Sequence, residues 1–153
     1  MDGLIKVIQN VVGRSVELKD KYTQESSAPI EFACIFCQSG KEYSKFTKEI
    51  EKLGKIVEKT PTGFTYLLND SIETKAGPLS LVKIRKPDFR KERGDADFNT
   101  NYTKLKEKYL HNSKFELVKY ATFEMLRLSD PGFDVMTCFS NIPKSINLEI
   151  KLQ

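Results

Sequence analysis

The first apolar pattern along the chain has the period of a helix. Apolar or small residues recur at spacings of three and four, which are the spacings of one helical face. This stripe consists of Leu4, Ile8, Val11, Ser15, Leu18 and Tyr22. It predicts an amphipathic helix over residues 3–22. We interpret this helix as a packing lid on a core, and the alternative is a surface for a partner or a second copy of the chain.

The period of the hydrophobic pattern then changes repeatedly over residues 31–88. Phe32–Gln38 is an almost continuous apolar run, which is typical of a central strand. Ser39 and Glu42 form a capping box at the start of a helical pattern over residues 40–53. Three strand patterns follow this helix, at residues 55–59, 64–68 and 79–86. The order of this first unit is therefore strand, helix, strand, strand, strand.

The same order returns between residues 94 and 140. A short strand pattern at 95–99 precedes a helical pattern at 101–111. Three further strand patterns lie at residues 114–120, 122–128 and 134–139. The alternation of Ile146, Leu148 and Ile150 predicts one more edge strand in the tail, residues 142–153.

We therefore predict an α+β fold in which two successive βαβββ units form a cleft, preceded by an N-terminal helix. A chain of 153 residues has the size of one domain, so we assign residues 1–153 to a single domain. Within it, residues 31–88 and 94–140 form the two units.

This doubled order resembles the vicinal oxygen chelate superfamily, which includes glyoxalase I, bleomycin-resistance proteins and extradiol dioxygenases. The resemblance implies a divalent metal held by His or Glu on the first and last strands of each half. The matching positions in this chain are Ala33 or Cys34, Ile84 or Arg85, Asp95 and Asp97, and Met136 or Cys138. None of them is a histidine, and the single histidine, His111, lies at the end of a predicted helix. We therefore expect no tightly bound metal and no cofactor.

The net charge of +4 is concentrated in one segment. Residues 83–93, KIRKPDFRKER, contain six basic and two acidic side chains, and charge is balanced over the rest of the chain. Arg85 lies at the end of a predicted strand, and arginine binds carboxylate or phosphate through two parallel hydrogen bonds. With Arg93, this segment indicates an anion site, and a solvated basic loop is the alternative.

Three acidic residues are further candidates. Asp95 and Asp97 are two apart on a strand and face the same way, so they need a nearby cation such as Arg85 or Arg93. One of them could act as an acid or base if its pKa were raised. Glu124 shares a strand face with two leucines that we expect to be buried, which is unusual for a carboxylate. We interpret Arg127 as a surface group.

The cysteines and the N-terminus bear on the cellular location of the protein. Cys34, Cys37 and Cys138 are odd in number and widely spaced, so we expect buried thiols and no disulfide framework. No apolar run approaches the ~18 residues of a membrane span, and the N-terminus lacks the features of a signal peptide. We therefore expect a cytoplasmic protein that does not contact a membrane.

Three hypotheses for function follow. The first is a small-molecule domain that binds an anionic ligand through the residues Arg85, Arg93, Asp95, Asp97 and Glu124. The second is a metal-independent enzyme in which Asp95, Asp97 or Glu124 is the general acid or base. The third is a weak nucleic-acid binder that uses residues 83–93, which the balanced charge elsewhere disfavours. A homodimer is left open. The sharpest expectation is that Arg85, Asp95 and Asp97 cluster between the two halves, with Glu124 nearby.

Overall fold

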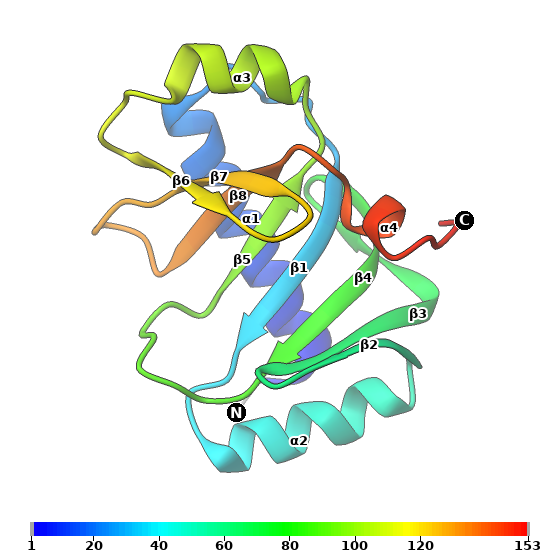
Figure 1. The fold of residues 1–153 in the computed structure, drawn as a ribbon. Helices are drawn as coiled ribbons and strands as arrows, with labels where there is room; N and C mark the ends of the chain where they lie inside the picture. Colours follow the sequence, from blue (N-terminus) through cyan, green and yellow to red (C-terminus); the bar gives the residue numbers. More distant parts are fainter. Residues whose placement is uncertain (1, 153) are drawn as a thin grey trace.

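The computed structural model describes residues 2–152, and all strands within them belong to one eight-stranded sheet (Figure 1). The strands follow the order β2-β3-β4-β1-β5-β8-β7-β6 across the sheet. The first half of the chain contains α1 (Leu4–Tyr22), β1 (Ile30–Phe36), α2 (Gly40–Glu51), β2 (Gly54–Thr60), β3 (Gly63–Thr74) and β4 (Gly77–Arg85). The second half contains β5 (Gly94–Phe98), α3 (Tyr102–Tyr109), β6 (Phe115–Lys119), β7 (Glu124–Leu128), β8 (Val135–Ser140) and α4 (Lys144–Asn147).

The sheet is symmetric about its central pair of strands. In each unit the first strand pairs in parallel with the last, β1 with β4 and β5 with β8. The two units join where β1 and β5 run antiparallel. The predicted double βαβββ order behind an N-terminal helix is therefore confirmed.

Helix α1 packs against one face of the central strands, behind them in the view of Figure 1. Alternate strand residues such as Ala33 and Ala96 join its apolar stripe in the main core. Two buried polar groups fix its position: the Ser15 hydroxyl donates to the carbonyl of Met136 at 3.1 Å, and the Thr137 hydroxyl donates to the carbonyl of Ser15 at 2.8 Å. The helix is thus part of the core. None of the helices in residues 2–152 is both long and apolar enough to cross a bilayer.

The start of α2 has the N-cap bond of the predicted capping box, and its glutamate reaches the residue before the N-cap. The Ser39 hydroxyl accepts a hydrogen bond from the backbone N–H of Glu42 at 3.1 Å, and the Glu42 carboxylate accepts one from the N–H of Gln38 at 3.0 Å. One of the otherwise unpaired N–H groups of the helix is thereby satisfied, together with that of Gln38 just before it.

The prediction of an edge strand in the tail is wrong. Residues Lys144–Asn147 form the short helix α4, which follows Pro143. The backbone N–H of Ser145 donates to the carboxylate of Glu31 on β1 at 2.8 Å, which anchors the tail near the middle of the sheet. A partner 114 positions away in the sequence decides this conformation, so the local alternation of apolar residues misleads.

Candidate functional site

A cavity of about 180 Å³ lies on the face of the sheet opposite α1. Both units, the loop between them and helix α4 contribute to its wall. The lining residues are Phe32, Cys34, Phe36, Lys83 and Arg85 from the first unit, Asp95, Asp97, Tyr120, Phe123, Met125, Arg127 and Cys138 from the second, Arg90 from the connecting loop, and Lys144 from α4. The cavity is therefore the cleft between the two halves.

Strand register explains why these residues meet. Cys34 on β1 lies opposite Lys83 on one side and opposite Asp95 on the other. Arg85 pairs in register with Phe36, and Asp97 pairs with Phe32. Successive residues of a strand face opposite ways, so all of these side chains point away from the helix-covered face. The structure thus brings Arg85, Asp95 and Asp97 to one cavity, and their binding of a ligand stays a prediction.

The two aspartates occupy an unfavourable environment for charge. Burial raises the pKa of Asp97 to about 7, although the Ser140 hydroxyl donates to its carboxylate at 2.5 Å. Burial raises the pKa of Asp95 to about 6, and the positive charges of Arg127 and Arg85 oppose this rise. No described residue hydrogen-bonds or ion-pairs with the Asp95 carboxylate. Both groups can exchange a proton near neutral pH.

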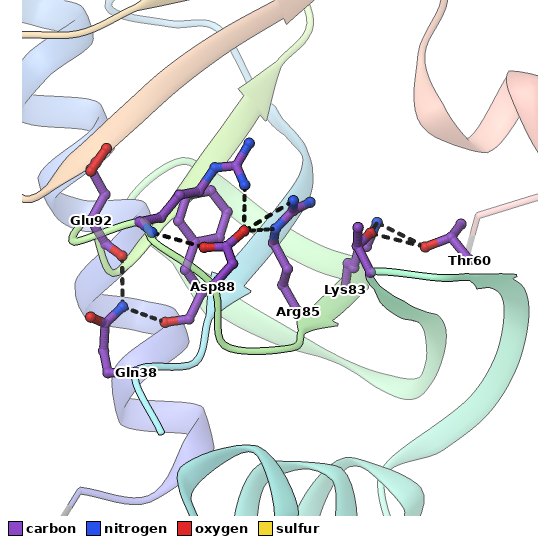
Figure 2. A network of polar contacts seen from close by, with 9 residues as sticks. Gln38, Thr60, Lys83, Arg85, Asp88 and Glu92 are labelled. Atoms are coloured by element: carbon purple, nitrogen blue, oxygen red, sulfur yellow. Dashed lines mark hydrogen bonds and ion pairs between the residues drawn. The ribbon is translucent and has the colours of Figure 1, made fainter. Parts of the chain in front are cut away.

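Arg85 does not pair with these aspartates. Its guanidinium contacts the carboxylate of Asp88 at 3.3 Å, and Arg90 contacts the same carboxylate at 2.6 Å (Figure 2). The backbone N–H of Arg90 also donates to Asp88 at 2.8 Å, so the loop after β4 folds back on itself. The expectation that Arg85 directly neutralises Asp95 or Asp97 is therefore wrong, and Arg85 acts on Asp95 only through its field.

Arg93 lies outside this cavity. Its guanidinium holds the carboxylate of Glu42 with two contacts, at 2.8 and 3.2 Å, and donates to the carbonyl of Phe36 at 3.2 Å. Arg93 borders a different depression, beside α1 and α2. The expectation that Arg93 shares a site with the aspartates is wrong, because it precedes β5 and turns toward the start of α2.

Glu124 lies on the opposite face of the sheet. Its carboxylate accepts hydrogen bonds from the Tyr102 hydroxyl and the Lys106 ammonium of α3, both at 2.7 Å. It shares this face with the buried Leu126 and Leu128, as the alternation along β7 requires. The expectation that Glu124 lies near the aspartates is therefore wrong.

The same alternation identifies Arg127 as a cavity residue that the sequence interpretation missed. If Leu126 and Leu128 face the helices, Arg127 must face the other way, and it lines the cavity. Its Nε is buried and has no hydrogen-bond partner, although its guanidinium also interacts with the thiol of Cys138. Its Nη1 lies 3.6 Å from the exposed Glu116. The interpretation of Arg127 as a surface group is wrong.

Two lysines complete the set of cations. The Lys83 ammonium donates to the hydroxyls of Thr60 at 3.2 Å and Thr62 at 2.9 Å (Figure 2). Lys144 reaches the cavity from α4 and forms an ion pair with Glu58 at 2.9 Å. No sequence signal placed Lys144 here, because its segment has the pattern of a strand.

Aromatic rings form much of the remaining wall. Tyr120 and Phe123, in the turn between β6 and β7, stack with their ring centroids 4.7 Å apart. The guanidiniums of Arg85 and Arg90 lie 5.9 and 5.5 Å from the ring centroid of Phe36, within cation–π range. The cavity thus combines positive charge with flat apolar surfaces.

The three cysteines are buried and unpaired, as the sequence predicts. Cys34 and Cys138 line the cavity, and Cys37 belongs to the main core. Burial raises the pKa of all three thiols, to about 12 for Cys37. They are therefore protonated at neutral pH and are poor nucleophiles.

The cavity does not fit the metal that the resemblance implies. Within residues 2–152 no three side chains of His, Cys, Asp or Glu gather as metal ligands. At the matching strand positions the cavity presents a protonated thiol at Cys34 and a guanidinium at Arg85. A cation at such a position opposes the binding of a second cation.

Comparison with known proteins gives a fold and no family. No protein-family model and no curated protein sequence match the chain. A solved structure described as "Structural Genomics, Protein EC4020" matches with a TM-score of 0.72 and 10% identity, over 97% of this chain and 93% of that chain. A glyoxalase/bleomycin resistance protein/dioxygenase superfamily member from Vibrio splendidus 12B01 matches with a TM-score of 0.44 and 12% identity, over 71% and 95%. The first match shows a shared fold, and neither indicates an activity.

Proposed function

We propose that the cavity between the two halves binds a small organic anion, with Arg127 as its principal anchor. Five basic side chains line this cavity, and the only acids among its lining residues are Asp95 and Asp97. Because the pKa values of both aspartates are raised, their negative charge is incomplete near neutral pH. Asp88 and Glu58 offset part of the charge of Arg85, Arg90 and Lys144, and the positive charge that remains favours an anion.

The buried Nε of Arg127 is the observation that carries this proposal. A buried donor on a charged group without an acceptor is costly, on the order of 1–3 kcal/mol. The nearest acid, Glu116, is exposed and lies 3.6 Å from a different nitrogen. A carboxylate or phosphate oxygen in the cavity would supply the missing acceptor, and the planar guanidinium suits either group.

The size and walls of the cavity limit the ligand. Its volume of about 180 Å³ is below the range of roughly 300–1,000 Å³ that holds drug-sized molecules. The stacked rings of Tyr120 and Phe123 offer a flat apolar surface. A compact carboxylate with an apolar or planar body therefore fits better than a large or highly hydrated anion.

Titration with acetate, benzoate and inorganic phosphate tests this proposal, with benzamide as an uncharged analogue. We expect benzoate to shift backbone amide resonances around the cavity and to bind at least tenfold tighter than benzamide. Arg127→Gln should weaken benzoate binding about tenfold or more. The matched control is Arg14→Gln, since Arg14 lies on α1 and pairs with Glu17 and Asp134 away from the cavity. Equal benzoate affinities for the two variants would overturn the proposal.

A metal-independent enzyme is the second candidate, and Asp95 is the residue that favours it. The Asp95 carboxylate has no hydrogen-bond partner among the described residues, and its pKa is about 6. Such a group can accept a proton from a carbon next to the carboxylate or carbonyl of a bound anion. Wild-type protein in D₂O should then exchange that carbon-bound hydrogen of a bound acid, whereas Asp95→Asn should not. Equal exchange by the two proteins would remove this candidate.

The nucleic-acid hypothesis gains no support from the basic segment. Lys83, Arg85 and Arg90 line the cavity, and Arg93 is held by Glu42. Of the six basic residues, only Lys86 and Lys91 are exposed rather than half-buried. Two lysines on a loop do not form the basic face that nucleic acid requires.

A further inference from the structure

Lys83 lacks the carboxylate partner that most lysines buried in part or in full have in this fold. Lys114, which is also half-buried, shares this lack and lies over the ring of Tyr22. Lys19 lies 2.8 Å from Asp20, Lys106 lies 2.7 Å from Glu124, and Lys144 lies 2.9 Å from Glu58. Among residues 2–152, no carboxylate lies within 4 Å of the Lys83 ammonium. Its only partners are two neutral hydroxyls. A lysine in the interior normally has a carboxylate partner, so this arrangement calls for a reason.

The cations around Lys83 further disfavour its protonated form. Arg85 lies on the same strand, and Arg90 and Lys144 reach the same cavity from the loop and from α4. Glu58 on β2 is already occupied by Lys144 and by the Thr65 hydroxyl at 3.0 Å. On the β3 side, Thr65 lies in register with Lys83 and Glu58 lies one strand beyond it. On the β1 side, the protonated thiol of Cys34 lies in register with Lys83 and Asp95 lies one strand beyond it.

These surroundings favour the neutral amine. Burial is the main cause that lowers the pKa of Lys83. Cys34 and Glu58 raise this pKa in part, and the charges of Arg85 and Lys144 lower it. The side chain is still half-buried rather than enclosed, so a molecule in the cavity can reach it. A desolvated lysine beside other cations is the usual form of an amine nucleophile.

We propose that Lys83 forms an imine with the carbonyl carbon of a small 2-oxo acid held in this cavity. The inference rests on the anion site proposed above, where Arg127 holds the carboxylate of the same molecule. The lone pair of Nζ forms the new bond to carbon, and the carbonyl π electrons move to oxygen. The nitrogen then loses its two protons in turn, the oxygen takes both and leaves as water, and a C=N bond remains. Asp95 and Asp97, which line the same cavity, can carry these protons.

Borohydride trapping tests the inference directly. The folded protein is incubated with pyruvate and sodium borohydride at pH 7.5, digested, and mapped by mass spectrometry. We expect the reduced adduct on Lys83 to form at least tenfold faster than on Lys144, which lines the same cavity but is held by Glu58. Lys83→Arg should lose the adduct at this position without gaining it at Lys144, and Arg127→Gln should slow trapping at subsaturating pyruvate.

Three results separate this inference from the proposed anion site. If Lys83 is trapped no faster than Lys144, or equally fast in the urea-unfolded protein, the proposal that Lys83 is a nucleophile is overturned. If propionate, which has no ketone, binds the cavity while pyruvate leaves no adduct, the proposed anion site is supported and the proposed role of Lys83 is contradicted. If neither acid binds and no adduct forms, both proposals fall.

Discussion

Folding moves the carboxyl of Asp97 from water into the cavity, where only 8% of the residue remains exposed. Its pKa rises from an ordinary value of about 3.9 to about 7. Between these values the folded state keeps a proton that the unfolded state has lost. The contribution of Asp97 to stability is therefore complete below about pH 4 and is lost as pH rises to 7, by an amount on the order of 2–4 kcal/mol.

Asp97→Asn should remove this contribution. At pH 8 the variant should be more stable than the wild type, because no charge is buried, and at pH 4 the two should differ little. Urea unfolding at pH 4, 6 and 8 measures the effect, with the exposed Asp70→Asn as a control. A stability difference of the same size at all three pH values would contradict this account.

Two arginines of the same segment should differ in their effect on stability. Arg85 pairs with Asp88 three residues away in a loop, and such partly exposed pairs contribute about 0–1 kcal/mol. Arg93 joins two distant segments through both oxygens of Glu42 and through the Phe36 carbonyl. We expect Arg85→Ala to lower the free energy of unfolding by less than about 1 kcal/mol and Arg93→Ala by more, about 1–3 kcal/mol. Denaturant unfolding of the two variants measures this difference. A larger loss of stability in Arg85→Ala than in Arg93→Ala would show that Arg85 has the structural role.

At the scale of elements, helix α2 depends on its N-terminal cap. The Ser39 hydroxyl accepts the N–H of Glu42, and loss of such a cap costs about 1 kcal/mol. We expect this loss of stability in Ser39→Ala. The matched control is Ser44→Ala on the exposed side of the same helix, where alanine should be neutral or slightly stabilising. Equal urea midpoints for the two variants would show that the cap is dispensable.

The junction of the two halves requires a glycine at position 94. A Cβ there would lie 2.2 Å from the carbonyl oxygen of Cys34 and 3.1 Å from a methyl of Val11. Gly94→Ala should therefore separate β5 from β1 and lower stability by several kcal/mol, or abolish folding. Gly13→Ala on α1 is the control, because its Cβ would meet only the flexible Lys75 side chain at 3.4 Å. That change should stabilise by up to about 1 kcal/mol, measured by thermal unfolding.

Element order was predictable because each segment carries its own signal. The capping box of α2 and the apolar stripe of α1 are local, and their helices lie at Gly40–Glu51 and Leu4–Tyr22, close to the predicted 40–53 and 3–22. The tail was not predictable, because its conformation depends on the distant Glu31. The predicted positions of Arg93 and Glu124 were wrong for a similar reason. Their partners, Glu42 and the residues of α3, are brought to them only by the fold.

At the scale of the whole molecule, the candidate site exists only when both units pair. Lys83 and Arg85 come from the first unit, and Arg127 and both aspartates come from the second. The sequence predicted a cleft with Arg85, Asp95 and Asp97, since topology alone brings their strands together. It gave no sign of Arg127 as an anchor, because an arginine between two leucines also suits an ordinary amphipathic strand. Only the order of strands in the sheet shows that the face of β7 with Arg127 lies toward the first unit.

The net charge of this cavity should make anion binding depend on pH. As pH falls from 8 to 5, Asp97 and then Asp95 take up protons at about 7 and about 6, while the arginines remain charged. Two negative charges beside the ligand are thereby removed. We expect the affinity for benzoate, measured by calorimetry, to rise about tenfold or more over this range, because benzoate itself stays largely ionised. The double variant Asp95→Asn/Asp97→Asn should bind benzoate more tightly than the wild type at pH 8, and its affinity should change little with pH. A wild-type affinity that falls toward pH 5 would mean that the aspartates help to hold the ligand as carboxylates, and the positive cavity would then be the wrong description of the site.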